Sequence, residues 1–477
     1  MNITSLVFLY FLVSVLGIYY LLPKKAQNYW LLVVSYVFVI SWAWQFALVL
    51  FVLTLLNYFL ARKLHKQSQD GLRLLWVGLA LNLLMLLIFR AYNFFIPEFT
   101  RLLAGIGIST TASDFVILLP IGLSFYTLQN ISYLVDVYRG QVKATQDIFD
   151  YALYLAYFPK ILSGPIERWR DFLPRLNQPR RVDNDILARS LSLIVIGAVR
   201  KLIVADLISA LIFWDAFEVP SKYTAPELIA FILMYSFYLY NNFAGYTSMA
   251  RGISGLFGIE LSQNFSQPYL SRSFNEFWNN WHITLSHWLR DYVFYPLSRS
   301  MMRRISNRQS PIILVIPPLV TMLVSGLWHG LGWNMLLWGG LHGLYLVFER
   351  VFALWRPATA PQERVWWRQA MSGVFVFGLV TIAWVPFATT DLSAAMAYWR
   401  GMLDWTSQVM RYRRILIFLP LAVFVMVFDW IQRSSNDEAF LLRWPRLAQA
   451  SMLASSIFLI LLLTSIGEGE PFVYQGF

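Results

Sequence analysis

Two histidines lie in a stretch of the chain that has no lysine, arginine, aspartate or glutamate, from Gln309 to Phe348. His329 stands in the sequence SGLWHGLGWN, and His342 follows in GGLHGLY. An ionisable side chain inside a bilayer is costly unless it is paired or used, so each of these histidines is a candidate functional residue. Desolvation favours the neutral imidazole, which is the form that accepts a proton as a general base.

The residues after His329 indicate that a helix ends there. Two glycines and Asn334 follow the apolar stretch 312–329, and they predict a helix terminus that places His329 within the membrane. A general base is our main hypothesis for His329, and a buried structural histidine is the alternative. His342 is flanked by glycines, which predict close helix packing, and we expect its ring to form an interhelical hydrogen bond.

A third histidine, His282, lies in an amphipathic segment from Ser271 to Leu297. The apolar residues with helical spacing are Phe274, Phe277, Trp278, Trp281, Leu285, Trp288, Leu289 and Tyr292. This spacing predicts one continuous helix, aromatic on one face and polar on the other, that lies in the membrane interface. His282 falls at the edge of the apolar face, where a structural hydrogen bond and a functional role are both open. His287 falls on the polar face, where we expect a solvated side chain.

The C-terminus has an unusual composition for a chain that leaves a membrane. Its last residues, 471–477, read PFVYQGF and include Tyr474. Such an apolar tail favours folding back into a groove, and interfacial anchoring by its aromatic residues is the alternative.

The whole chain has the composition of a membrane protein. It is 58% hydrophobic and only 13% charged, whereas soluble proteins are about 25% charged. Stretches near the length that spans a bilayer recur along the chain, and they predict an all-α polytopic membrane protein forming a single integral-membrane domain over residues 1–477. The predicted spans are 3–22, 29–42, 46–61, 72–89, 115–138, 186–212, 226–250, 312–329, 335–352, 370–388, 415–431 and 451–466.

The charge and the histidine spacing argue against two classes of protein. The net charge of +12 is not accompanied by a nucleic-acid recognition motif, and basic residues gather in the cytoplasmic loops of membrane proteins, so no nucleic-acid partner is expected. The chain has no cysteine and no HExxH motif, and His282 and His287 are five residues apart, so no metal site is expected.

Four motifs make the chain resemble the membrane-bound O-acyltransferase (MBOAT) family, in particular its bacterial alginate-acetylating, AlgI-like branch. They are PIGLSFYTLQNISYLVDVYRG (120–140), YFPKILSGPIERWRDFLPRL (157–176), FWNNWHITLSHWLRDYVFYPL (277–297) and SGLWHGLGWNMLLWGGLHGLYLVFER (325–350). The resemblance implies a catalytic core at about 115–350 and a ring of 11 to 12 helices around a tunnel, with interfacial and re-entrant helices. It also implies that His329 is the catalytic residue and His282 its companion. Candidate supporting residues in the motifs are Trp281, Trp328, Asn334, His342, Asp291 and Arg290.

The function implied by the resemblance is transfer of an acyl group, most simply acetyl, across the bacterial inner membrane for polysaccharide or cell-envelope O-acetylation. The expected donor is a cytoplasmic thioester, acetyl-CoA or an acyl carrier protein, and no bound cofactor is expected. The expected partners are the lipid bilayer and a periplasmic, esterase-like (SGNH) acetyltransferase. Tyr474 is the candidate acyl relay. Two alternatives remain. One is D-alanyl transfer from a carrier protein to teichoic-acid-type polymers. The other is a proton-coupled transporter that uses His329 as a relay, for which Asp136 is the clearest candidate for a buried carboxylate.

Overall fold

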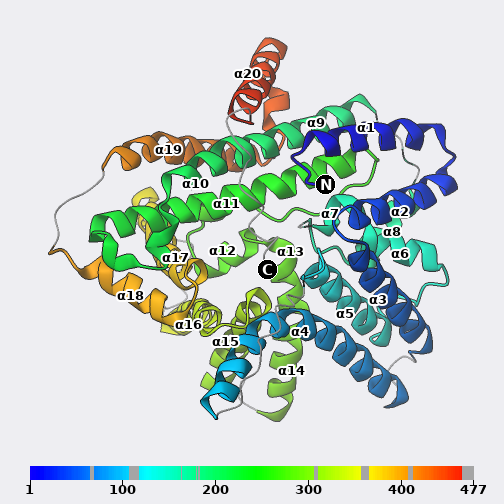
Figure 1. The fold of residues 1–477 in the computed structure, drawn as a ribbon, viewed down its shortest axis with the longest axis horizontal. Coiled ribbons are helices and arrows are strands. Elements are labelled where there is room, and N and C mark those ends of the chain that lie inside the picture. The colour runs from blue at the N-terminus through cyan, green and yellow to red at the C-terminus, as the bar shows by residue number, and fades with distance from the viewer. Residues whose placement is uncertain are drawn as a thin grey trace. The chain divides into compact units, whose positions relative to one another are not determined.

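The structure is a computed structural model in which all regular structure of the described residues is helical (Figure 1). It describes residues 1–64, 69–106, 118–162, 164–178, 180, 183–305, 310–355, 365–406 and 412–464. The predicted all-α fold is therefore confirmed for this part of the chain.

The chain forms two compact units. The first contains Met1–Ile194 and Met249–Ser262, and the second contains Val195–Ser248 and the described part of Gln263–Val473. Helices α9 and α11 each contribute residues to both units. All three histidines of interest belong to the second unit.

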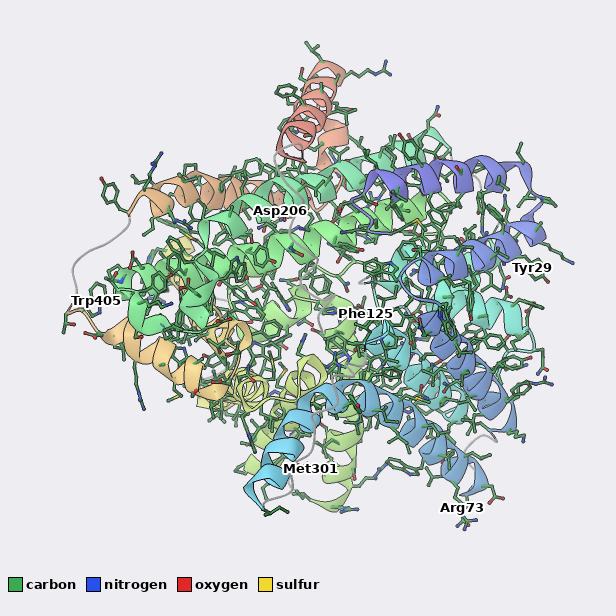
Figure 2. All side chains as sticks on the ribbon, in the orientation of Figure 1. Tyr29, Arg73, Phe125, Asp206, Met301 and Trp405 are labelled. Carbon is green, nitrogen blue, oxygen red and sulfur yellow. The ribbon has the colours of Figure 1, made fainter. Side chains whose placement is uncertain are left out.

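The first unit is built around helices that come from the first 198 residues of the chain. They are α1 (Leu6–Leu21), α2 (Lys24–Ile40), α3 (Trp44–Lys63), α4 (Gln69–Gly105), α5 (Leu123–Tyr138), α6 (Ile148–Ala156), α7 (Phe158–Ile161), α8 (Trp169–Asn177) and most of α9 (Asn184–Ala198). Helices α3, α4 and α5 pack against one another, and α5 is buried along almost its whole length (Figure 1). Phe125 of α5 is one of its interior side chains (Figure 2).

The second unit contains the remaining described helices. They are α10 (Asp206–Leu211), most of α11 (Ala225–Gly255), α12 (Phe274–Asn280), α13 (Ile283–Leu289), α14 (Tyr295–Arg304), α15 (Pro311–His329), α16 (Trp333–Trp355), α17 (Trp366–Ala388), α18 (Leu392–Leu403), α19 (Tyr412–Ser435) and α20 (Arg446–Thr464). A π-helical turn, Val199–Ala205, joins α9 to α10, and another, Arg290–Phe294, joins α13 to α14. Helices α10 and α19 lie side by side (Figure 1).

Each of the twelve predicted spans overlaps a helix. Among the described residues, six helices are long and apolar enough to cross a membrane: α3, α4 over Gln69–Tyr92, α11, α15, α17 and α19. Multiple crossings are therefore supported by length and composition, and the count of twelve stays a prediction.

The prediction of one continuous helix over Ser271–Leu297 is wrong. The helix is interrupted at Trp281 and His282, between α12 and α13, and the backbone of His282 has a φ of 42°. That left-handed conformation cannot continue a right-handed helix, and bonds from a distant loop stabilise it, which local spacing does not reveal. Seven of the eight residues of the predicted apolar face are nevertheless buried, so the face packs against protein.

Helices α15 and α16 form a closely packed hairpin, as the glycines around His342 predict. A Cβ atom added to Gly339 would meet the backbone carbonyl oxygen of Met322, and one added to Gly343 would lie 3.0 Å from the Cα of Leu319. The two backbones approach too closely for any side chain at these positions. The glycines therefore allow α16, which carries His342, to pack closely against α15.

Two neighbouring glycines give a matched test of this packing. We expect Gly339→Ala to lower the thermal unfolding temperature, since its methyl group can be accommodated only by backbone movement. Gly340→Ala makes the same change one residue away, where the nearest atom is a side-chain carbon at 4.0 Å, and alanine is the better helix former by about 1 kcal/mol. Thermal unfolding of the purified variants, followed by intrinsic fluorescence, should give a lower unfolding temperature for Gly339→Ala than for Gly340→Ala. Equal unfolding temperatures would contradict the close approach of the α15 and α16 backbones.

Candidate active site

His329 is the last residue of α15, so the predicted helix terminus is confirmed. Gly330 follows in an extended conformation, and its N–H donates to the carbonyl of Gly326 at 3.0 Å. Asn334, which the sequence placed in the break, instead lies in the first turn of α16. Its side-chain nitrogen donates to the carbonyl of Thr389 at 2.9 Å and so ties the start of α16 to the end of α17.

Aromatic rings surround His329, which is 4% exposed. Its ring centroid lies 4.8 Å from that of Trp328, 5.0 Å from that of Trp338 and 5.1 Å from that of Phe387, each ring meeting it edge-on. Access to this ring through a tunnel from either side of the membrane stays a prediction.

The structure brings His282 to the same tryptophan. Its ring is 6.1 Å from Trp328 and 4.8 Å from Phe243, and the residue is 1% exposed. Burial lowers the pKa of His282 to about 3, so the imidazole is neutral near pH 7. His282 and His329, which are 47 positions apart in the sequence, therefore contact the same indole ring, that of Trp328. A histidine accepts a proton as a general base only in its neutral form.

His342 contacts a second tryptophan, Trp338. Its ring is 5.0 Å from Trp338, which also contacts His329, and 5.1 Å from Trp278. The residue is fully buried, and neither ring nitrogen has a hydrogen-bond partner among the described residues. The predicted interhelical hydrogen bond is therefore wrong in the described structure, because this ring packs as an aromatic group within an aromatic cage.

The remaining motif residues divide into two groups. Trp281 is buried and packs on Trp384 at 4.9 Å, within the same aromatic cluster. Arg290 and Asp291 lie on the π-helical turn, where they form a partly exposed ion pair with each other at 3.0 Å. The ring contacts given for His282, His329 and His342 do not include Arg290 or Asp291. Tyr474 lies outside the described residues.

Besides Phe243, the rings that sequence reasoning missed include Trp338, Trp384 and Phe387, which contact the histidines or their neighbours. Trp338 could have been found, because it lies four residues before His342 and so shares its helical face. Trp384 and Phe387 lie on α17, and only the tertiary fold brings them to α15 and α16.

A buried ion pair in the second unit was also missed. Arg200, on the π-helical turn before α10, donates to the carboxylate of Asp429 on α19 and to the side-chain oxygen of Asn241 at 3.0 Å. Both charged residues are buried. The signal was present, since Asp429 is the only acidic residue between Arg414 and Asp437, and a lone carboxylate in a predicted span is a functional candidate.

The described ranges contain no group of three or more histidine, aspartate or glutamate side chains that could hold a metal ion.

The chain is similar to known membrane acyltransferases. The sequence profile of MBOAT, the membrane-bound O-acyltransferase family, matches residues 32–389, a range that includes His282, His329 and His342. The probable alginate O-acetylase AlgI of Pseudomonas putida is 33% identical over the full length of both chains. The peptidoglycan O-acetyltransferase of Helicobacter pylori is 30% identical, with 84% of this chain and 79% of that protein covered.

A more distant relative is the teichoic acid D-alanyltransferase of Bacillus subtilis, 28% identical over 56% of this chain and 68% of its own. All three relatives transfer acyl groups, and the family match covers most of the chain, so the transporter alternative is set aside. The chain belongs to the membrane-bound O-acyltransferase family, and it is a multi-pass membrane enzyme that transfers acyl groups to oxygen.

Proposed function

We propose that this enzyme transfers an acetyl group from a cytoplasmic thioester to an acceptor on the periplasmic side of a bacterial inner membrane, for O-acetylation of a polysaccharide or cell-envelope polymer. The relatives support acetyl over D-alanine, because the two O-acetylating proteins match 84% and 100% of this chain and the D-alanyltransferase matches 56%. Acetyl-CoA is the donor we favour, and an acyl carrier protein is the other thioester that suits the same chemistry. A periplasmic, SGNH-type partner would then complete delivery to the polymer.

The observation that carries the proposal is that His282 and His329, both buried, contact the ring of the same residue, Trp328. His329 is the proposed general base and His282 its companion. A buried neutral imidazole can remove the proton from an attacking hydroxyl, and the resulting oxyanion attacks the thioester carbonyl. The C–S bond breaks, the protonated His329 returns its proton to the leaving thiolate, and the free thiol and an oxygen ester are formed.

Tyr474 is the hydroxyl that we propose as the first acceptor. A phenol has a pKa of about 10, so rapid attack near neutral pH requires an activating base. The resulting aryl ester is more reactive than an alkyl ester, so the acetyl group could pass on to a serine hydroxyl of the periplasmic partner. The tail 471–477 would then be a carrier segment.

The donor can be tested with the purified enzyme in liposomes. Acetyl-CoA is expected to release free thiol in an enzyme-dependent reaction, whereas a D-alanyl-loaded carrier protein is expected to release none above background. Release from the D-alanyl carrier alone would replace the proposed donor with the alternative. Release from acetyl-CoA, from an acetyl-loaded carrier protein and from the D-alanyl carrier all at background, by a preparation that remains folded, would contradict the proposed function.

A further inference from the structure

Three non-glycine residues among those described have a positive φ: Gln267 at 48°, His282 at 42° and Asn436 at 49°. A non-glycine residue in this left-handed region is strained, and the conformation persists only where the surrounding structure enforces it. Gln267 and His282 are 15 positions apart, and Asn436 comes 154 positions after His282. In the second unit, hydrogen bonds join the segments that carry them.

The loop over residues 264–271 holds the turn at His282 from both sides. Its Ser266 N–H donates to the carbonyl of Asn280 at 3.0 Å, just before the turn. Its Asn264 accepts from the N–H of Ile283 at 2.9 Å through the backbone, and from the hydroxyl of Thr284 at 2.6 Å through the side chain. The left-handed backbone of His282 is therefore enforced by this loop.

The C-terminal end of α19 in turn holds that loop and the start of α12. The guanidinium of Arg433 donates to the carbonyl of Leu270 at 2.6 Å and to the carboxylate of Glu276 at 2.7 Å. The other carboxylate oxygen of Glu276 accepts from the N–H of Arg272 at 2.7 Å. Gln432 accepts from the side chain of Gln267 at 3.4 Å.

Helix α19 is itself anchored at this end. Asp429 pairs with Arg200, and Arg200 also donates to Gln432 at 3.1 Å. The side-chain nitrogen of Gln432 donates to the carbonyl of Glu438 at 3.1 Å, closing the turn that contains Asn436. This end of α19 is therefore a fixed support, and it lies beyond residues 32–389, the stretch that matches the family.

We propose that the C-terminal end of α19 positions His282, with Arg433 and Gln432 as positioning residues that act through the loop 264–271 and α12. This inference rests on the proposed function, in which His282 accompanies the catalytic base. The Arg433–Glu276 pair is 34% and 32% exposed, and such pairs contribute little to global stability. Its loss should therefore change the turn at His282 more than it changes the unfolding of the whole protein.

The geometry of the turn can be followed through the reactivity of its histidine. We would compare Arg433→Gln and Glu276→Gln with a control, Arg443→Gln, which breaks a similar ion pair with Asp437 (3.1 Å), beyond the last residue of α19. Full-length proteins in detergent would be treated with diethyl pyrocarbonate, and modification of each histidine measured by peptide mass spectrometry. We expect His282 to react about tenfold faster in the first two variants, as local opening increases, while His342 and the control are unchanged.

The double variant and the kinetics complete the test. Because Arg433 and Glu276 contact each other, the increase in His282 reactivity in the double variant should be smaller than the two single increases combined. Turnover with acetyl-CoA should fall about tenfold or more, with KM for acetyl-CoA unchanged, as expected for a displaced reacting group. Wild-type reactivity of His282 in both variants, or an equal rise at His342, would overturn the positioning role.

Failure of the proposed function would give a different pattern. If His282→Ala retained full turnover while Arg433→Gln still raised the reactivity of His282, α19 would position the turn but the turn would not serve catalysis. If His282→Ala lost turnover while Arg433→Gln left both reactivity and turnover unchanged, the proposed function would stand and the role of α19 would fall.

Discussion

Replacing His329 with alanine is expected to reduce polymer O-acetylation to background, a loss of about 100- to 10,000-fold for removal of a general base. The variant should still insert and purify, because His329 is at the end of α15 and the glycine contacts that seat the α15–α16 hairpin remain. The measurement is the acetyl content of extracted polymer from cells in which the variant replaces the wild-type protein.

His287 provides the control for this substitution. It is a histidine on α13, five residues from His282, but it is half-exposed rather than buried. His287→Ala should leave the acetyl content within about twofold of wild type, as expected for a surface substitution away from the site. Normal acetylation by His329→Ala would contradict the role of His329 as the general base. His329 would then be a buried structural histidine, which is the alternative hypothesis.

Substituting Tyr474 with phenylalanine is the second change with a large expected effect. It removes a single oxygen and keeps the ring that would anchor the tail. We expect acetyl transfer to fall to background, because the phenol is the proposed nucleophile and no other group of that side chain can form the ester. Thiol release from acetyl-CoA and polymer acetyl content would be measured together.

Tyr474→Ala separates the two hypotheses for the tail. If the hydroxyl carries the acyl group, phenylalanine and alanine should be equally inactive. If the ring only anchors the tail at the interface, phenylalanine should be fully active and alanine reduced. The second pattern would exclude Tyr474 as a relay while leaving His329 as the base for another acceptor.

The features that sequence predicted well are those set by nearby residues. The helix terminus at His329 follows from two glycines within three positions, and the close seating of α16 follows from glycines beside His342. The all-α architecture follows from apolar length. Each of these depends on local propensity or on composition, which the sequence states directly.

The features that sequence predicted poorly depend on distant contacts. The segment around His282 has an uninterrupted helical pattern, yet its backbone turns there because Asn264 and Ser266 bond to either side of the break. Phe387 reaches His329 only through the packing of α17. His342 has a side chain that favours a hydrogen bond, but tryptophan rings enclose it instead.

The mass of the C-terminal peptide shows whether His329 removes a proton from a hydroxyl that then takes the acyl group. Purified wild-type protein would be incubated with acetyl-CoA in the absence of an acceptor and digested, and the peptide containing Tyr474 analysed by mass spectrometry. We expect this peptide to gain one acetyl group on the tyrosine oxygen in the wild type and to gain none in His329→Ala. Equal acetylation of the tyrosine in both proteins would contradict the proposed role of His329.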